Sequence, residues 1–187
     1  MLKKIWHFIW YNDSLASWFV NLILAFVIVK WIIYPGIGFI FGTSFPIVAV
    51  VSGSMEHNGQ DFDSWWEGKE GQYDQYNLTK QQFDIFPFKN GFNKGDIMFL
   101  KGVQPEDIKI GAVLVYESSR YKNPIIHRVV KKTKDGAYSF TTKGDNNNAA
   151  DSNPVTDDQI QRTGKAVFRI PYFGWIKIWF VTLLGVG

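Results

Sequence analysis

A run of twenty apolar residues near the start of the chain, LASWFVNLILAFVIVKWIIY from Leu15 to Tyr34, restricts the possible folds more than any other feature. Its one charged residue, Lys30, stands near its far end. A helix of twenty residues is about 30 Å long, which matches the hydrocarbon core of a bilayer. Because the run is apolar on all faces, it predicts a transmembrane helix rather than the surface helix of a globular protein.

The flanks of this run support a membrane anchor and exit segment over residues 15–41. Lys30 is placed to extend its amine to the membrane surface, and Pro35, Gly36 and Gly38 are expected to end or kink the helix. Aromatic residues typical of membrane interfaces stand at Trp6, Trp10, Trp18, Trp31 and Tyr34. A cleaved signal peptide is the alternative, but the run is longer than an ordinary signal-peptide core and no A-x-A-like site follows it.

Charges around the anchor favour one orientation. Lys3 and Lys4 precede it, which favours cytoplasmic residues 1–14 and an extracytoplasmic domain in a single-pass cell-membrane protein, although Lys30 reduces this bias. An Asn77-Leu78-Thr79 glycosylation sequon is compatible with that orientation. The apolar C-terminal segment, residues 173–187, is too short to span a bilayer alone, so it either lies in the interface or begins a second span.

The chain between these apolar segments, residues 42–172, is predicted to be mainly β. Short runs rich in Val, Ile, Phe and Tyr, separated by Gly, Pro, Asn or Asp, predict strands at 45–51, 96–100, 112–117, 125–131, 137–142 and 165–170. Asp135-Gly136 between two of them is a hairpin signal. Without a long amphipathic helix to compete, these runs indicate an antiparallel sheet that forms a barrel-like domain or packed sheets.

Residues 57–93 interrupt this pattern as an acidic, aromatic-rich insertion. A short helix is expected within 78–86. The segment either packs on its own rings, which is the favoured interpretation, or forms a flap that dips into the membrane or covers a substrate.

Composition excludes several classes of function. The net charge of the 187 residues is only +3 and the basic residues are scattered, so no nucleic-acid partner is expected. The absence of cysteine excludes disulfides, thiol catalysis and the usual structural zinc sites. Neither metal-ligand spacings nor glycine-rich phosphate loops occur, so we expect no metal and no cofactor.

Ser54, in the stretch VVSGSMEHN, is the candidate nucleophile. A serine hydroxyl attacks well only when a neighbouring base takes its proton. The chain has three histidines. His7 precedes the anchor, His57 is three residues from Ser54, and His127 stands in a predicted strand.

Residues downstream include two possible partners for a histidine base and one alternative base, a lysine. Asp145 and Asp151, in TTKGDNNNAADSNP, each have the chemistry to hold His127 in one tautomer. Lys143 is the candidate base of a Ser-Lys dyad, which requires a lysine that burial keeps neutral. The residues alone leave these alternatives open.

Four motifs in order, SGSME, KGDIMFL, HRVV and TTKGDNN with a later Asp, follow an N-terminal anchor. In this the chain resembles signal peptidase I, of the archaeal and endoplasmic-reticulum type in which histidine replaces the catalytic lysine of most bacterial relatives. The motifs cover the anchor and about half of the remaining chain.

This resemblance implies roles for five residues. Ser54 would be the nucleophile and His127 the general base. Asp151 would orient His127, and Asp145 would hold the turn or the site together. The backbone N–H of Ser54 and the hydroxyl of Ser52 would form the oxyanion hole.

The implied activity is a membrane-bound serine endopeptidase that removes signal peptides from secretory preproteins with small residues at the first and third positions before the cut. Membrane lipid and unidentified accessory subunits are the other expected partners. Two alternatives remain, a non-catalytic scaffold of the same fold and a peptidase for surface-layer or pilin-like precursors. The chain departs from the family where His57 replaces a usual proline and about forty residues separate Glu56 from Asp96, which makes His57 a rival base.

Overall fold

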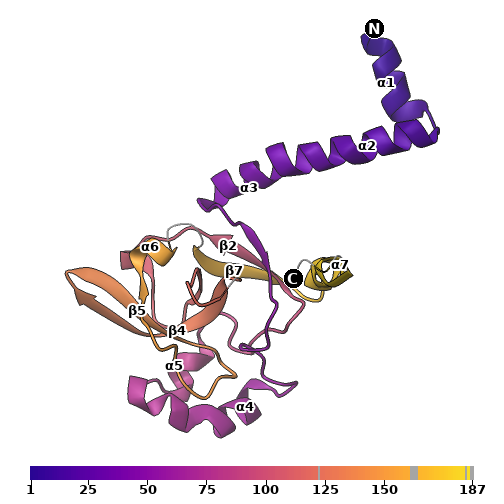
Figure 1. Cartoon of the computed structure of the whole chain (residues 1–187). Coiled ribbons are helices and arrows are strands. Elements are labelled where there is room, and N and C mark those ends of the chain that lie inside the picture. Colours follow the sequence, from indigo (N-terminus) through magenta and orange to yellow (C-terminus); the bar gives the residue numbers. More distant parts are fainter. Residues whose placement is uncertain (122, 161–163, 184, 186–187) are drawn as a thin grey trace. The chain divides into compact units, whose positions relative to one another are not determined.

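The computed structural model describes residues 1–121, 123–160, 164–183 and 185. It contains two compact units, Met1–Ile40 and Phe41–Gly187 (Figure 1), which we treat separately.

The first unit is helical. Its elements are α1 (Leu2–Tyr11), α2 (Leu15–Ile28), the π-helical turn η1 (Val29–Ile33) and α3 (Tyr34–Phe41), which crosses the boundary between the units. The helix from Leu15 to Phe41 is 27 residues long and apolar enough to cross a membrane, and none of its most apolar 18-residue window is buried. Length and exposed apolar surface therefore fit a membrane anchor.

The helix does not end at Pro35, contrary to one of the two expected effects of that residue. A proline lacks an N–H and its ring clashes with the carbonyl four residues earlier. Here the turn η1 comes directly before α3, and the Tyr34 N–H bonds to the carbonyl of Val29, five residues back. The wider π-turn adjusts the backbone just before Pro35, so the helix continues to Phe41.

Polar residues of α2 hold the end of α1. Ser17 Oγ donates to the Phe8 carbonyl at 2.6 Å, and Asn21 Nδ2 donates to the Ile9 carbonyl at 2.8 Å. These bonds satisfy carbonyls that a helix end leaves without intrahelical partners. Helix α1 was not predicted from the sequence.

The second unit contains one seven-stranded antiparallel sheet, so the mainly β prediction is confirmed (Figure 1). The strand order is β1-β2-β7-β3-β4-β5-β6, which leaves β1 and β6 at the edges. The strands are β1 (Ile47–Ala49), β2 (Ile97–Lys101), β3 (Val113–Tyr116), β4 (Ile125–Asp135), β5 (Ala137–Lys143), β6 (Val155–Thr156) and β7 (Gly164–Ile170). Shorter elements are η4 (Pro105–Asp107) and α6 (Asp157–Ile160).

All six expected strands are present, with different ends. The first is shorter than expected, and β4 extends to Asp135. Asp135 pairs with Ala137 across Gly136, whose φ of +70° suits the tight turn. Strand β6 was not predicted, because two residues carry no periodic pattern.

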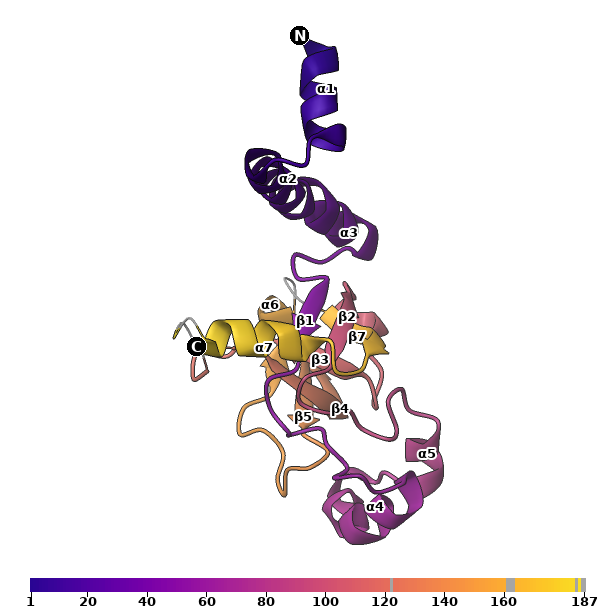
Figure 2. The ribbon, with the colours of Figure 1, turned by 90° about the vertical axis from the view of Figure 1, so that its right-hand side faces the viewer.

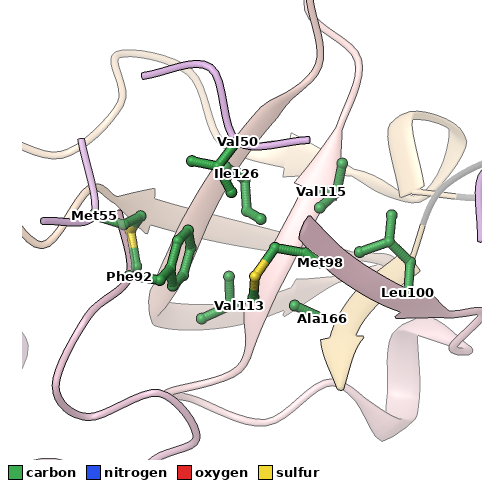
Figure 3. Packing of buried hydrophobic residues seen from close by; sticks show 9 residues of the cluster. All are labelled: Val50, Met55, Phe92, Met98, Leu100, Val113, Val115, Ile126 and Ala166. Carbon is green, nitrogen blue, oxygen red and sulfur yellow. The ribbon is translucent and has the colours of Figure 1, made fainter. Parts of the chain in front are cut away.

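Buried side chains fill both faces of the sheet. One cluster, drawn in Figure 3, comprises Val50, Met55, Phe92, Met98, Leu100, Val113, Val115, Ile126 and Ala166. A second comprises Ile108, Ala112, Leu114, Tyr116, Val129, Phe140, Val155 and Ile160. Alternate residues of β3 enter different clusters, as the two-residue period of a strand requires.

The insertion folds around its own aromatic residues. Its helices are α4 (Phe62–Lys69), η2 (Glu70–Gln72), η3 (Asp74–Tyr76) and α5 (Lys80–Asp84). Its buried cluster comprises Phe62, Trp65, Trp66, Tyr73, Leu78 and Phe83, together with Val130 of β4. The favoured interpretation, packing on its own rings, agrees with this cluster, and α5 lies where a short helix was expected.

Helix α7 (Gly174–Leu183) follows the sheet and lies beside β1 (Figure 2). Ten helical residues extend only about 15 Å, half of a bilayer core. Its exposed apolar side chains have helical spacing and therefore share one face, at Ile176, Trp179, Phe180 and Leu183. Residues 184 and 186–187 of the expected C-terminal segment lie outside the described residues.

We expect Phe83→Ala to lower the free energy of unfolding of the second unit by about 3–5 kcal/mol, because it leaves a cavity in the aromatic cluster. Phe83 is fully buried. Ile85→Ala is the matched control, since Ile85 is 82% exposed in the same segment. Chemical denaturation of both variants is the measurement, and equal small losses would contradict the view that this cluster stabilises the fold.

Candidate active site

Ser54 lies in a turn that its neighbour Met55 anchors to the core. The Met55 side chain is fully buried, whereas Ser54 is partly exposed. The hydroxyls of Ser52 and Ser54 are 3.2 Å apart, within hydrogen-bonding distance. The turn therefore presents a serine hydroxyl at the surface on a backbone fixed from beneath.

The turn after β5 packs directly against this serine. The Asn146 N–H donates to the Ser54 carbonyl at 2.8 Å, and the Asp145 N–H contacts Met55 Sδ at 3.4 Å. A Cβ on Gly144 would stand 2.7 Å from the Ser54 carbonyl oxygen, too close for any other residue without a backbone shift. The GDN sequence thus lets two distant turns make backbone contact.

His127 on β4 forms the second part of the site with Asp151. Its Nδ1 lies 2.7 Å from Asp151 Oδ2. The same carboxylate oxygen accepts from Tyr116 Oη at 2.8 Å and from Thr142 Oγ1 at 2.7 Å. Both supporting residues are buried, so neighbouring strands fix the carboxylate in front of the imidazole.

These contacts keep Asp151 ionised. Burial raises the pKa of Asp151, but the His127 interaction and the two hydroxyl donors outweigh it, so the pKa lies below its ordinary value. An ionised carboxylate accepts the proton on Nδ1, which leaves Nε2 of neutral His127 with its lone pair. Across the part of the chain that is described, no hydrogen bond joins Ser54 to His127.

Asp145 faces a different partner, the guanidinium of Arg128. Arg128 Nε and Nη2 donate to its two carboxylate oxygens at 2.9 and 2.7 Å, and both side chains are fully buried. The remaining donors bind the carbonyls of Pro87, Phe88 and Gly111 at 2.8–3.0 Å. All five N–H groups of the guanidinium are therefore used.

His57 is not placed to act as a base for Ser54, because its ring contacts Trp65 and Asp145 instead. Its ring stacks on Trp65 with centroids 3.8 Å apart, and its Nε2 lies 3.3 Å from Asp145 Oδ2. Its buried Nδ1 has no partner among the described atoms. The imidazole thus connects the insertion to the Asp145 turn.

Lys143, the other rival base, is fully buried behind the same turn. Its Nζ donates to the carbonyls of Gly144 and Asn147 at 3.1 and 2.7 Å, and lies 3.5 Å from Tyr73 Oη. Burial lowers the pKa of Lys143 to about 8. Two of its donors thus close the turn and the third reaches the insertion at Tyr73, and none of the hydrogen bonds described for Lys143 reaches Ser54.

The alternation of strand β4 explains this division. Consecutive residues of a strand point to opposite faces, so His127 and Arg128 cannot share a partner. Asp151 meets the first and Asp145 the second. Four residues of the site were not predicted from the sequence: Arg128, Tyr116, Thr142 and Asn146. Only Arg128 had a signal, because it stands beside the candidate histidine in a predicted strand.

No group of three or more His, Cys, Asp or Glu side chains is arranged to hold a metal ion within the described residues. The donors of the site are thus a serine, a histidine and carboxylates that already have protein partners.

Comparison with known proteins gives a consistent set of relatives. No family model matches the chain. It is 28% identical over 153 residues to the signal peptidase complex catalytic subunit SEC11C of human and dog, covering 78% of this chain. It is 28% identical over 172 residues to the SEC11 subunit of Colletotrichum graminicola, and 29% over 165 residues to that of Verticillium alfalfae.

The extent of these matches differs. The aligned region spans 62% of the length of the mammalian proteins, and 79% and 75% of the two fungal ones. For the fungal pair it covers 87% and 84% of this chain. The similarity therefore extends well beyond the short motifs around Ser54 and His127.

We expect the stability of the second unit to fall at acid pH through Asp145. Burial raises the pKa of Asp145, but Arg128 and then His57 bring it below the ordinary 3.8. The unfolded chain therefore takes up the proton first, so the stabilisation is complete above about pH 4 and is lost as the pH falls through the lower folded pKa.

Denaturation as a function of pH below 5 checks this expectation. Asp145→Asn should be less stable at neutral pH and should show a flatter acid dependence than the wild type. Asp135→Asn, at an exposed hairpin position, is the control. An unchanged acid slope in Asp145→Asn would refute the assignment.

Proposed function

We propose that this chain, which belongs to the archaeal and endoplasmic-reticulum type of the signal peptidase I family, is a membrane-anchored serine endopeptidase that removes signal peptides from secretory preproteins. The relatives are named as catalytic subunits of signal peptidase complexes. The single observation that carries the proposal for this chain is the 2.7 Å His127–Asp151 pair. Asp151 of this pair lies on the loop 144–151, which also contacts the Ser54 turn through Asn146.

In this mechanism Ser54 Oγ attacks the carbonyl carbon of the scissile bond. Nε2 of His127 takes the hydroxyl proton and then gives it to the leaving amine, which releases the mature protein and leaves an acyl-enzyme. Water, deprotonated by the same nitrogen, hydrolyses the ester and regenerates Ser54. Asp151 holds the Nδ1 proton and stabilises the imidazolium formed in each step.

The oxyanion of each tetrahedral intermediate would bind the backbone N–H of Ser54 and the hydroxyl of Ser52. The supporting geometry is the 3.2 Å separation of the two serine hydroxyls. A donor of this kind contributes about 10²–10³-fold in rate.

An extended substrate would bind beside β1. This strand stands at the edge of the sheet and ends five residues before Ser54, and an extended peptide adds readily to such an edge. Small residues around the nucleophile, Ser52 and Gly53, leave room for the substrate backbone. Preproteins with small residues before the cut fit this arrangement.

We propose that the protein acts at the membrane surface. The helix Leu15–Phe41 would anchor the chain, with residues 1–14 cytoplasmic and the second unit, including the catalytic region 42–172, outside. The exposed apolar face of α7 would lie in the interface. Since the relatives are named as subunits of a complex, we expect accessory subunits as partners.

Cleavage of a model preprotein in liposomes tests the chemistry. Ser54→Ala, which removes one oxygen, should lower kcat by at least about 10³-fold, and His127→Ala by about 10²–10⁴-fold because the base is lost. Ser152→Ala, at an exposed serine beside Asp151, should retain full activity.

Other outcomes assign the chemistry differently. Full activity of Ser54→Ala would remove the nucleophile. If His127→Ala stays active and the rate rises only as the pH passes about 8, the base is Lys143. A wild type that binds preproteins without cutting them would favour the scaffold function.

Protease accessibility tests the orientation. In intact cells the exposed loop at Asn58–Gln60 should be cut by added protease, and in inverted vesicles it should be protected. The reverse pattern would place the second unit in the cytoplasm.

A further inference from the structure

Asn146 connects the insertion to the serine turn through all four of its polar groups. Its backbone N–H donates to the Ser54 carbonyl at 2.8 Å, and its side-chain Nδ2 donates to the Gly53 carbonyl at 3.1 Å. On the other side its Oδ1 accepts from Asn58 Nδ2 at 3.2 Å, and its carbonyl accepts from Lys69 Nζ at 3.2 Å. Two bonds thus face the serine turn and two face the insertion.

Buried packing fixes both donors from the insertion. Lys69 ends helix α4, whose Trp65 and Trp66 are 2% and 1% exposed in the aromatic cluster. Asn58 follows His57, which stacks on Trp65 and faces Asp145. Movement of the backbone that carries either donor would require the aromatic cluster to repack, which is costly in a densely packed interior.

These contacts distinguish the insertion from a flap. A segment that only covers a bound substrate needs no bond to the serine turn in the free protein, and its loosening is expected to raise KM. Here the insertion is bonded to the turn behind Ser54 in the free protein, and Arg128 fixes its far end through the Pro87 and Phe88 carbonyls.

We propose that Asn146 is a positioning residue through which the insertion, residues 57–93, holds the Ser54 turn in its reactive geometry. This inference rests on the proposed function, with Ser54 as nucleophile. Catalysis of this kind depends on placement of the attacking atom, and a displacement of about 1 Å can cost about 10²-fold in rate. Loosening Asn146 should therefore lower kcat and leave KM nearly unchanged.

The test uses the full chain in liposomes with the double variant Asn58→Gly and Lys69→Met. Glycine keeps the positive φ of Asn58 at +54°, and methionine keeps the apolar stem of Lys69. We expect kcat to fall by roughly 10-fold or more, KM to stay within about twofold, and the midpoint of thermal unfolding to stay close to that of the wild type. In the single variant Lys69→Arg, which keeps Asn58 and a donor at position 69, kcat should stay near the wild-type value.

Lys80→Met is the matched control. Lys80 belongs to the same insertion and pairs at 2.8 Å with Asp63, which is largely exposed. It does not contact Asn146, so kcat should be unchanged. An equal fall in kcat for this control would mean that any loss of charge on the insertion has the same effect, and would overturn the inference.

Hydrogen exchange at the Asn146 amide gives a readout that does not depend on activity. This amide bonds to the Ser54 carbonyl, so the double variant should exchange it faster than the wild type. An unchanged exchange rate would overturn the inference. A rise in KM with kcat unchanged would also overturn it and would indicate that the insertion acts as a flap over the substrate. If the wild type cleaves nothing, the proposed function fails, while the exchange measurement still decides whether the insertion holds the Ser54 turn.

Discussion

The buried guanidinium of Arg128 is the interaction on which the second unit depends. Two of its N–H groups bind Asp145, and three bind the carbonyls of Pro87, Phe88 and Gly111. A buried cation that loses its partner is strongly destabilising, so the segments that provide these acceptors must be in place together. Strand β4, the end of the insertion, the turn before β3 and the turn after β5 are consequently joined at one point.

Strand β4 also places the structural ion pair and the candidate histidine on opposite faces. His127 and Arg128 are consecutive, and their side chains lie on opposite faces of β4 because a strand alternates with each residue. One loop supplies a carboxylate to each face, with Asp151 at the histidine and Asp145 at the arginine. The ion pair thus fixes the turn that contacts the Ser54 turn, and it leaves the His127 imidazole free to pair with Asp151 on the other face.

The elements that were predicted well are those whose structure depends on the residues of one short segment. The strands were predicted from short runs rich in Val, Ile, Phe and Tyr between turn residues, and the helix from Leu15 was predicted from the length of its apolar run. Helix α4 was missed, because its sequence FDSWWEGK contains several weak helix formers and no clear period. It forms because burial of Trp65 and Trp66 in the aromatic cluster outweighs that local preference.

By itself the sequence determined the long apolar helix, the mainly β domain, the aromatic insertion and a short list of candidate residues: one serine, the histidines, the lysine and two aspartates. Only the tertiary structure decided which aspartate meets His127, that His57 faces Asp145 instead of Ser54, and that Lys143 is occupied by the turn carbonyls. The physical reason is that hydrogen bonds and ion pairs need contacts within about 3 Å. The two histidine pairs join residues that are 24 and 88 positions apart. Sequence spacing does not set such distances, whereas sheet register and packing do.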